Sequence, residues 1–477
     1  MHKSRWVLTG VAAATVTACG PAAGTSAPAT HGSVYAASAT LTGPVRVGHI
    51  IEPASAVSTN LAAHGYVEQE FFASGTAHAF TATSSPADGR WTIEPSAAAS
   101  YKTRVVVRRP ASPAKFNGTV VVEWMNVSGG ESAPDWDYLN PMLMRDGYAY
   151  VGVSAQALGV EGGAPIFGVG APSPGLVHAE PSRYGTLHHP GDQYALDMYA
   201  QIGRALRATH HPAVLGPLHA RHVVALGESQ SAFFLTTFAD AIQPRTHAYD
   251  GIFIHSRGGG GTGIADGGSG LTGDLRIRTD LTVPVFMFET QTDLTTLGYA
   301  AAQQPNTERI RTWEVAGTSH ADAYLVGSNA TTLGCTQPIN DGPQHTVVQA
   351  AFTAFDKWVT HDTPPPSPSP FDLASTSPTT YALDKYGNVI GGVRTPAVDV
   401  PVSTLSGQAP PGSSILCSLF GSTTPLSAAT LAHLYPTKAD YLAAYAKSLD
   451  HAISKGFVLL ADRATLLAQA RQVPIPG

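Results

Sequence analysis

The chain has 477 residues, of which 43% are hydrophobic and 13% are charged, with 48 glycines and 36 prolines. A hydrophobic fraction of this size supports a large buried core and excludes a wholly disordered chain. The formal net charge of −6 provides no basic surface for nucleic acid and no polybasic patch for a membrane. The sequence has no HExxH motif and no Cys/His cluster at zinc spacing, so we expect no metal site and no other cofactor.

The N-terminus has the pattern of an export signal. Lys3 and Arg5 precede an apolar run at 6–16, which is too short to span a bilayer. The following VTAC resembles a bacterial lipobox, and this resemblance implies cleavage before Cys19 and lipid attachment to its sulfur. An ordinary secretory signal cleaved nearby is the alternative. Both interpretations place the mature protein outside the cytoplasm, and membrane contact is expected only through lipid at Cys19.

Residues 1–18 are therefore assigned to a signal peptide and residues 19–39 to a small, polar tether without periodicity. Strand-like runs then alternate with turns as far as about residue 110. The run 65–72, followed by the small residues 73–77, predicts a hairpin, and 101–108 predicts a further strand.

Short apolar runs and helical stretches alternate in the central part of the chain. The apolar runs lie at 119–124, 148–153, 222–226, 251–254 and 283–288, and the helical stretches at 138–146, 192–208 and 231–242. Runs of this kind suit strands that are buried on both faces of a parallel sheet. The alternation predicts a doubly wound, mostly parallel α/β sheet with antiparallel strands at its N-terminal side.

Two long segments, 155–191 and 256–273, interrupt this alternation, and such loops usually carry function or cover a site. The second contains a formal GxGxxG at 258–263, but more glycine follows it instead of an apolar helix. A dinucleotide site needs the N-terminus of that helix for its pyrophosphate. We therefore interpret the motif as a mobile loop at the rim of a site.

The last part of the chain is predicted to be helical. A Pro-rich break follows an amphipathic helix at 346–360, and helical spacing returns at 426–434, 438–454 and 462–470. We assign 40–362 to a catalytic domain and 363–477 to a helical extension packed on it. In an oxidising compartment Cys335 and Cys417 are expected to form a disulfide that ties the two parts together. Two separate buried thiols are the alternative.

The sharpest local feature is the segment 222–235, HVVALGESQSAFFL. A β-branched strand ends at Gly227, and a helix begins within two or three residues of Ser229. A serine on so tight a strand-to-helix turn projects its hydroxyl above the sheet, as a nucleophile requires. Small neighbours are needed there; Gly227 is one, and Ser231 replaces the glycine of the common GxSxG pattern. A serine that only caps a core helix is the alternative, and Ser231 is disfavoured because it lies within the helix.

Candidates for the acid and the base follow the serine in the expected order Ser, acid, His. His320 comes directly after a short strand at 311–316 and a glycine turn, where a general base can be partly exposed. Asp293 lies a few residues beyond the strand at 282–288 and is the preferred acid. Glu289, at the end of the same strand, is the rival acid, and an ordinary surface histidine is the alternative for His320.

Two backbone N–H groups are expected to stabilise an oxyanion. The helix that follows Ser229 leaves its first N–H groups free and carries positive partial charge there, so the N–H of Gln230 is the first candidate. The second donor is expected from the turn after the strand at 119–124, where Asn126 and Val127 precede two glycines. An ordinary Asn/Gly turn is the alternative.

These residues resemble the bacterial "α/β hydrolase domain-containing" family of large exported or periplasmic proteins. The matching segments are 65–77, 122–130, 189–194, 227–232, 313–322 and 412–420, of which GESQSA and WEVAGTSHAD are the most specific. The resemblance implies an α/β-hydrolase fold with a triad of Ser229, Asp293 and His320. It does not imply a substrate.

The sequence thus predicts an exported serine hydrolase that acts on a small, neutral or apolar carboxylic ester through an acyl-enzyme. Amide hydrolysis and acyl transfer on the same triad are alternatives that the sequence does not separate. A non-catalytic surface lipoprotein that binds a small ligand is the alternative from a different class. The oligomeric state is not predicted.

Overall fold

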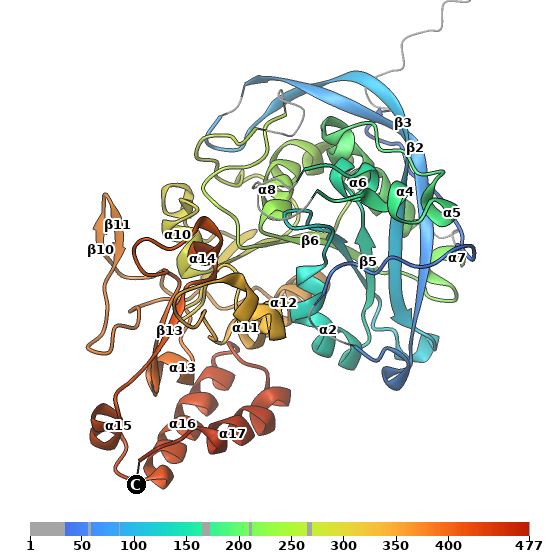
Figure 1. The fold of residues 1–477 in the computed structure, drawn as a ribbon. Helices are drawn as coiled ribbons and strands as arrows, with labels where there is room; N and C mark the ends of the chain where they lie inside the picture. Colours follow the sequence, from blue (N-terminus) through green and yellow to red (C-terminus); the bar gives the residue numbers. More distant parts are fainter. Residues whose placement is uncertain are drawn as a thin grey trace, which may run out of the picture.

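The computed structural model describes residues 34–55, 59–84, 86–164, 172–208, 212–264 and 270–476. The predicted signal peptide and Cys19 lie outside the described residues. One large mixed sheet organises the chain, with nine strands in the order β1-β2-β3-β5-β4-β6-β7-β8-β9 (Figure 1). Its strands are β1 Thr40–Thr42, β2 Tyr66–Ser84, β3 Thr92–Pro110, β4 Thr119–Trp124, β5 Ala149–Val153, β6 His222–Glu228, β7 Gly251–His255, β8 Val285–Glu289 and β9 Ile310–Glu314.

The sheet combines an antiparallel and a parallel part. The pairs β1–β2, β2–β3 and β3–β5 are antiparallel, whereas β5, β4, β6, β7, β8 and β9 pair in parallel. The five apolar runs form β4, β5, β6, β7 and β8, and the short predicted strand at 311–316 forms β9. These six parallel strands are buried almost throughout. The predicted α/β fold, mostly parallel with antiparallel strands at its N-terminal side, is therefore confirmed.

The predicted hairpin turn at 73–77 is wrong, because these residues continue β2. Gly75 pairs with Tyr101 in the middle of the long β2–β3 ribbon, and the chain turns only between Ser84 and Thr92. A Cβ on Gly75 would lie 2.8 Å from Oε1 of Gln201, which belongs to the helix packed on this strand. The small side chains mark a close approach between a strand and a helix, and not a turn.

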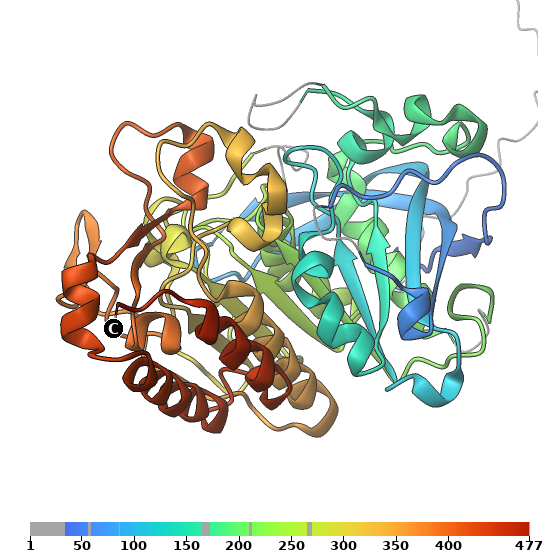
Figure 2. The same cartoon turned by 60° about the horizontal axis from the view of Figure 1, so that its bottom comes forward.

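Helices cover both faces of the sheet (Figures 1 and 2). The helices α6 Ala195–Arg207 and α8 Gln230–Thr237 pack on one face, and α2 Pro134–Arg145 and α12 Gln344–His361 pack on the other. Alternate strand residues divide between the two cores: Val223 and Ala225 of β6 face the first core, whereas Val224 and Leu226 face the second.

The predicted long segments contain short helices and packed backbone. The short helices here and beside the sheet are α3 Ala157–Glu161, α4 Gly175–Ala179, α5 Pro181–Tyr184, α7 Pro212–Leu215, α9 Gln243–Thr246, α10 Gln291–Thr295 and α11 Ala323–Val326. The glycine-rich motif at 258–263, for which the sequence predicted a mobile loop at the rim of a site, is largely buried in the structure. Gly258 and Gly259 are buried, and the N–H of Gly259 donates to the carbonyl of Leu297 at 3.0 Å.

The C-terminal extension contains strands as well as the predicted helices. Two small antiparallel sheets are formed by β10 Leu373–Thr376 with β11 Thr379–Tyr381 and by β12 Ser403–Ser406 with β13 Ser422–Pro425. Its helices are α13 Pro396–Asp399, α14 Ile415–Phe420, α15 Ala428–Leu434, α16 Lys438–Ser454 and α17 Arg463–Gln472. The strands have only three or four residues each and no apolar run, so period-2 patterning was too short to reveal them.

The extension is joined to the edge of the large sheet. Backbone hydrogen bonds link Val393 to Glu314 at 2.7 Å and Ala316 to Val393 at 3.0 Å, so Val393 continues the ladder beyond β9. The buried ring of Trp313 also packs against Phe457, with the ring centroids 5.1 Å apart. The extension therefore shares both backbone and side-chain contacts with the large sheet.

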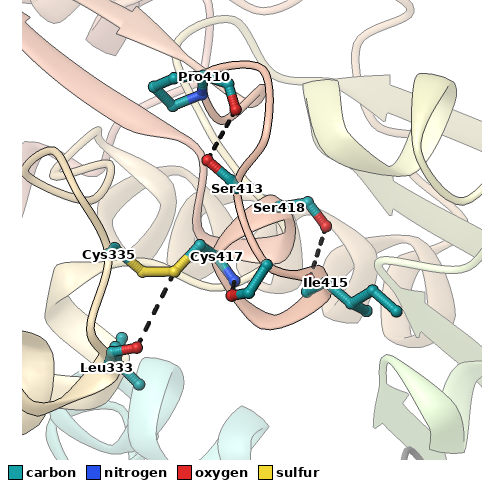
Figure 3. Close-up of a disulfide and its surroundings, with 8 residues drawn as sticks. Leu333, Cys335, Pro410, Ser413, Ile415, Cys417 and Ser418 are labelled. Carbon is teal, nitrogen blue, oxygen red and sulfur yellow. Dashed lines mark hydrogen bonds between the residues drawn. A yellow bond between two sulfur atoms is a disulfide. The ribbon is translucent and has the colours of Figure 1, made fainter.

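A disulfide between Cys335 and Cys417 makes this connection covalent (Figure 3). Cys417 lies on α14, and Cys335 lies in the segment that follows α11 and precedes α12. The predicted pairing is confirmed, and the alternative of two free thiols is wrong. The bridge spans 82 residues, and closing a loop of this length typically stabilises a fold by about 2–4 kcal/mol.

No helix in the described part of the chain has both the length and the apolar character needed to cross a membrane.

Candidate active site

Ser229 stands alone between strand and helix. Glu228 ends β6, Gln230 begins α8, and the backbone of Ser229 between them has φ 58° and ψ −120°. A residue with a side chain adopts such a φ at a cost of about 1–3 kcal/mol, and it keeps it only where its surroundings hold it there. The Ser229 N–H donates to the carbonyl of His255 at 3.0 Å, and its own carbonyl accepts from Ala232 at 2.9 Å. The predicted turn is therefore present.

The spacing of strand and helix explains the small residues on either side of Ser229. A Cβ on Gly227 would lie 2.9 Å from the Cβ of Ser231 and 3.1 Å from a methyl of Leu235. Ser231 is fully buried within α8, facing Gly227. A larger residue at either position would push the helix away from the strand, so serine substitutes for the more common glycine without changing the turn.

The three residues predicted as a triad lie in one hydrogen-bonded chain. The Oγ of Ser229 is 2.7 Å from Nε2 of His320, and Nδ1 of His320 is 2.7 Å from Oδ1 of Asp293. These partners require Nδ1 to carry the proton and Nε2 to accept one from the serine. Asp293 is fully buried, and His320 is only 4% exposed, so the histidine is more buried than the partly exposed base that the sequence predicted.

Asp293 is fixed by the start of α10. Its second oxygen, Oδ2, accepts hydrogen bonds from the backbone N–H and the hydroxyl of Thr290, both at 2.7 Å. Thr290 caps the helix, and Asp293 occupies the third helical position, so the two residues form a reciprocal capping box. This arrangement leaves Oδ1 free to point at His320.

Glu289, the rival acid, does not reach His320. It is the last residue of β8 and is fully buried, and the hydrogen bonds of the His320 ring go to Asp293 and Ser229. Burial raises the pKa of the Glu289 carboxyl well above its usual range, and the charge of Asp293 acts in the same direction. Glu289 is therefore a buried acid whose charged form is disfavoured, and it does not contact His320.

The extension is hydrogen-bonded to α10, which carries the acid, and to the loop that carries the base. The hydroxyl of Thr292 donates to the carbonyl of Gly407 at 2.5 Å and accepts from the N–H of His320 at 3.1 Å. The next residue, Ala321, donates its N–H to the carbonyl of Leu419 on α14 at 3.1 Å. Because α14 also carries Cys417, the disulfide and these hydrogen bonds secure the same segment (Figure 3).

Of the two candidates for the second oxyanion donor, the structure favours Val127. The backbone N–H of Asn126 donates to the carbonyl of Ser132 at 2.9 Å, so it is already used within its own turn. Nothing among the described residues accepts a hydrogen bond from the N–H of Val127. The Asn126 side chain instead donates to the carbonyl of Glu228 at 3.2 Å, which holds this turn against Ser229. The N–H of Gln230, at the first position of α8, stays a candidate donor.

A buried polar cluster that the sequence did not reveal holds the backbone of Ser229 through the carbonyl of His255. Nδ1 of His255, whose carbonyl accepts from Ser229, is 2.7 Å from Oδ1 of Asp135, and its Nε2 is 3.3 Å from the amide of Gln344. Both His255 and Asp135 are fully buried. Burial lowers the pKa of His255 to about 3 and raises that of Asp135 well above its usual range, so burial disfavours the charged form of both side chains.

The residues of this cluster come from β7, α2 and α12, which are far apart in the sequence. Nothing in their local sequence distinguishes them from ordinary core residues.

Among the described residues, no group of three or more His, Cys, Asp or Glu side chains could hold a metal ion.

A family model described as "Alpha/beta hydrolase domain" matches residues 41–468. The chain belongs to the α/β hydrolase domain family. The family resemblance predicted from GESQSA and WEVAGTSHAD is therefore confirmed, and the α/β hydrolase match includes most of the C-terminal extension. Membership supports a hydrolase, whereas the bond that is cleaved and the substrate belong to the proposals below.

Several solved structures of hydrolases resemble parts of this α/β hydrolase. A lidless α/β serine hydrolase from Xanthomonas campestris is 10% identical, with a TM-score of 0.29, and the match covers 51% of this chain and 86% of that one. A lipase/esterase from Lactobacillus plantarum is 13% identical, with a TM-score of 0.27 and coverage of 47% and 86%. A glucuronoyl esterase from Solibacter usitatus is 10% identical, with a TM-score of 0.27 and coverage of 59% and 85%. No curated protein sequence matches the chain.

The two candidate acids can be separated by a matched pair of substitutions. Asp293→Asn keeps the shape but favours the wrong tautomer of His320, so we expect a loss of about 10³–10⁴-fold in kcat for ester hydrolysis. Glu289→Gln keeps a polar side chain of the same size at a position that does not contact His320, and we expect kcat within about threefold of the wild type. Steady-state kinetics on a p-nitrophenyl ester measures both, and a large loss in Glu289→Gln with a small one in Asp293→Asn would reverse the assignment.

Asp322, two residues beyond His320, predicts a pH-dependent stability. Burial raises its pKa to about 7, and its Oδ1 accepts from Tyr138 and Leu325 at 3.1 and 3.0 Å. The folded protein therefore holds this proton to higher pH than the unfolded chain, and stability is lost as the pH rises from about 4 through 7.

Asparagine keeps the accepting oxygen but cannot ionise. We expect the free energy of unfolding of Asp322→Asn, relative to the wild type, to rise by on the order of 4 kcal/mol between pH 4 and pH 8. Urea unfolding at both pH values measures this difference, in which groups common to both proteins cancel. A difference that does not change with pH would show that Asp322 titrates normally in the folded protein.

Proposed function

We propose that this protein is an exported serine hydrolase that cleaves carboxylic ester bonds through an acyl-enzyme on Ser229. The proposal is carried by one observation, the continuous chain from Asp293 through His320 to Ser229 with both contacts at 2.7 Å. The strained backbone of Ser229 supports it, because strain of this kind is kept where a group must project toward a reactant.

In the acylation step, His320 acts as the general base. Nε2 takes the proton of Ser229 while Oγ attacks the carbonyl carbon of the ester, and Asp293 stabilises the imidazolium that forms. The N–H groups of Gln230 and Val127 are the proposed donors to the developing oxyanion. Nε2 then passes its proton to the leaving alcohol, and the acyl group stays on Oγ.

In the deacylation step, the same groups act on water. His320 removes a proton from the water as its oxygen attacks the acyl carbonyl, and the carboxylic acid leaves when Nε2 returns the proton to Ser229. This cycle uses only side chains and backbone groups of the chain.

The charges around Ser229 favour an uncharged substrate. The ionisable side chains that meet the His320 ring among the described residues are the acids Asp293 and Glu228. An anionic ester would meet the charge of Asp293 and find no cation among these side chains to bind it, so a neutral or apolar ester is the proposed substrate class. A panel of p-nitrophenyl esters compared with a p-nitroanilide separates ester from amide hydrolysis.

Purified mature protein is expected to hydrolyse p-nitrophenyl esters in the range from acetate to palmitate, with a preferred chain length. Ser229→Ala removes the nucleophile, and we expect a loss of more than about 10³-fold in kcat. Ser231→Ala is the matched control, because it removes a buried hydroxyl that faces Gly227 and should retain activity within a few-fold. Binding of ester without turnover by the wild-type protein would instead support a non-catalytic ligand-binding lipoprotein.

Export and lipid anchoring are proposed from the first 19 residues of the sequence. The disulfide supports export, since such bonds persist mainly in oxidising compartments. In a bacterial host, the wild-type protein is expected to sediment with membranes, and Cys19→Ser is expected to move it to a soluble fraction. Wild-type protein found in the soluble extracytoplasmic fraction would indicate an ordinary secretory signal, and protein in the cytoplasm would refute export.

A further inference from the structure

Glu228, which directly precedes Ser229, places a second carboxyl beside the ring of His320. Its side chain is 5% exposed, and its Oε1 lies 3.7 Å from Nε2 of His320, the nitrogen that also contacts Ser229. The amide of Asn126 donates to the carbonyl of Glu228 at 3.2 Å and to its Oε2 at 3.4 Å. The carboxyl is therefore held in place by the turn that follows β4, and it is not a solvated surface group.

The distance between Glu228 and His320 fits a shared partner better than a direct contact. A separation of 3.7 Å is too long for a direct hydrogen bond, and it leaves both atoms close enough to contact one water oxygen placed between them and the acyl carbon. Before acylation, Nε2 of His320 accepts the hydrogen bond of the Ser229 hydroxyl. Once Oγ carries an acyl group it has no proton to donate, and Nε2 is then open to the water that must attack.

We propose that Glu228 is a positioning residue for deacylation, which holds the hydrolytic water against Nε2 of His320. This inference rests on the acyl-enzyme of the proposed function. The water oxygen forms a bond to the acyl carbon while one of its protons passes to Nε2. The bond between the acyl carbon and Ser229 Oγ then breaks, Oγ takes the proton back from Nε2, and a carboxylic acid is released.

Whether the Glu228 carboxyl is protonated decides whether it donates a hydrogen bond to the water or accepts one from it. Burial raises the pKa of Glu228 well above its usual range, and the charges of Asp135 and Asp293 act in the same direction. A neutral carboxyl with Oε2 accepting from Asn126 carries its proton on Oε1, which faces His320. That O–H donates to the water oxygen and leaves a water proton directed at Nε2. Glutamine at this position offers an amide N–H in the same place, so it should replace the acid.

The test compares Glu228→Gln with Glu228→Leu, which removes the polar group at similar size. Three quantities are measured: the rate of labelling by a fluorophosphonate, which follows the acylation chemistry alone; kcat and KM for a p-nitrophenyl ester; and the acyl-enzyme in acid-quenched turnover mixtures by intact mass. For Glu228→Leu we expect kcat and KM to fall together by about tenfold or more, with accumulated acyl-enzyme and a labelling rate within about threefold of the wild type. For Glu228→Gln we expect all three quantities near wild-type values.

Equal losses in labelling rate and in kcat for Glu228→Leu would overturn the proposal, because Glu228 would then support the whole triad. A loss of kcat in Glu228→Gln as large as that in Glu228→Leu would overturn the proposal as well, because the negative charge of the carboxylate would then be the property that matters. An unchanged kcat in both variants would also do so. Glu228→Ala, with a smaller side chain, takes the place of the leucine variant if that one does not fold. Wild-type protein that is not labelled would refute the proposed function itself, so this control is read first.

Discussion

The backbone of Ser229, held at positive φ, is the constraint on which the rest of the candidate site depends. The turn from β6 into α8 brings strand and helix so close that a Cβ on Gly227 would lie 2.9 Å from the Cβ of Ser231. The Ser229 N–H is tied to the carbonyl of His255, whose own ring is anchored by the fully buried Asp135. The strain at one residue is thus balanced by a polar cluster and a packed sheet, and the hydroxyl is presented to His320 without any movement of the core.

The other half of the site consists of Asp293 at the start of α10 and His320 on the loop after β9, and the C-terminal extension is bonded to both segments. Thr292 of α10 accepts from the N–H of His320 and donates to the carbonyl of Gly407 in the extension. Leu419 bonds the residue after His320, and the disulfide at Cys417 closes the same segment. A side chain on a free loop would lose the fixed geometry that general-base catalysis needs. The extension therefore serves the site, and the α/β hydrolase match that runs to residue 468 agrees with this view.

The sequence predicted those parts of the fold and site that depend on local pattern. Buried strands such as β4 and the turn at Ser229 follow from short apolar runs and small residues, and α16 was predicted with its observed bounds. Features set by distant contacts were not predictable. Gly75 is small because α6 approaches it, not because the chain turns there. Asp293 and Glu289 lie four residues apart, and only the direction of α10 decides which one faces His320. The places of His255 and Glu228 likewise depend on the register of neighbouring strands.

The central claim is that His320 activates the hydroxyl of Ser229, and peptide mapping after reaction with diisopropyl fluorophosphate tests it most directly. Phosphorylation by this reagent, in which Oγ displaces fluoride from phosphorus, needs an activated serine and no knowledge of the natural substrate. The structure predicts one adduct per chain on the peptide that contains Ser229, with a rate that falls by about 10³-fold or more in His320→Ala. An adduct on Ser231 or elsewhere, or labelling of Ser229 that does not depend on His320, would contradict this account.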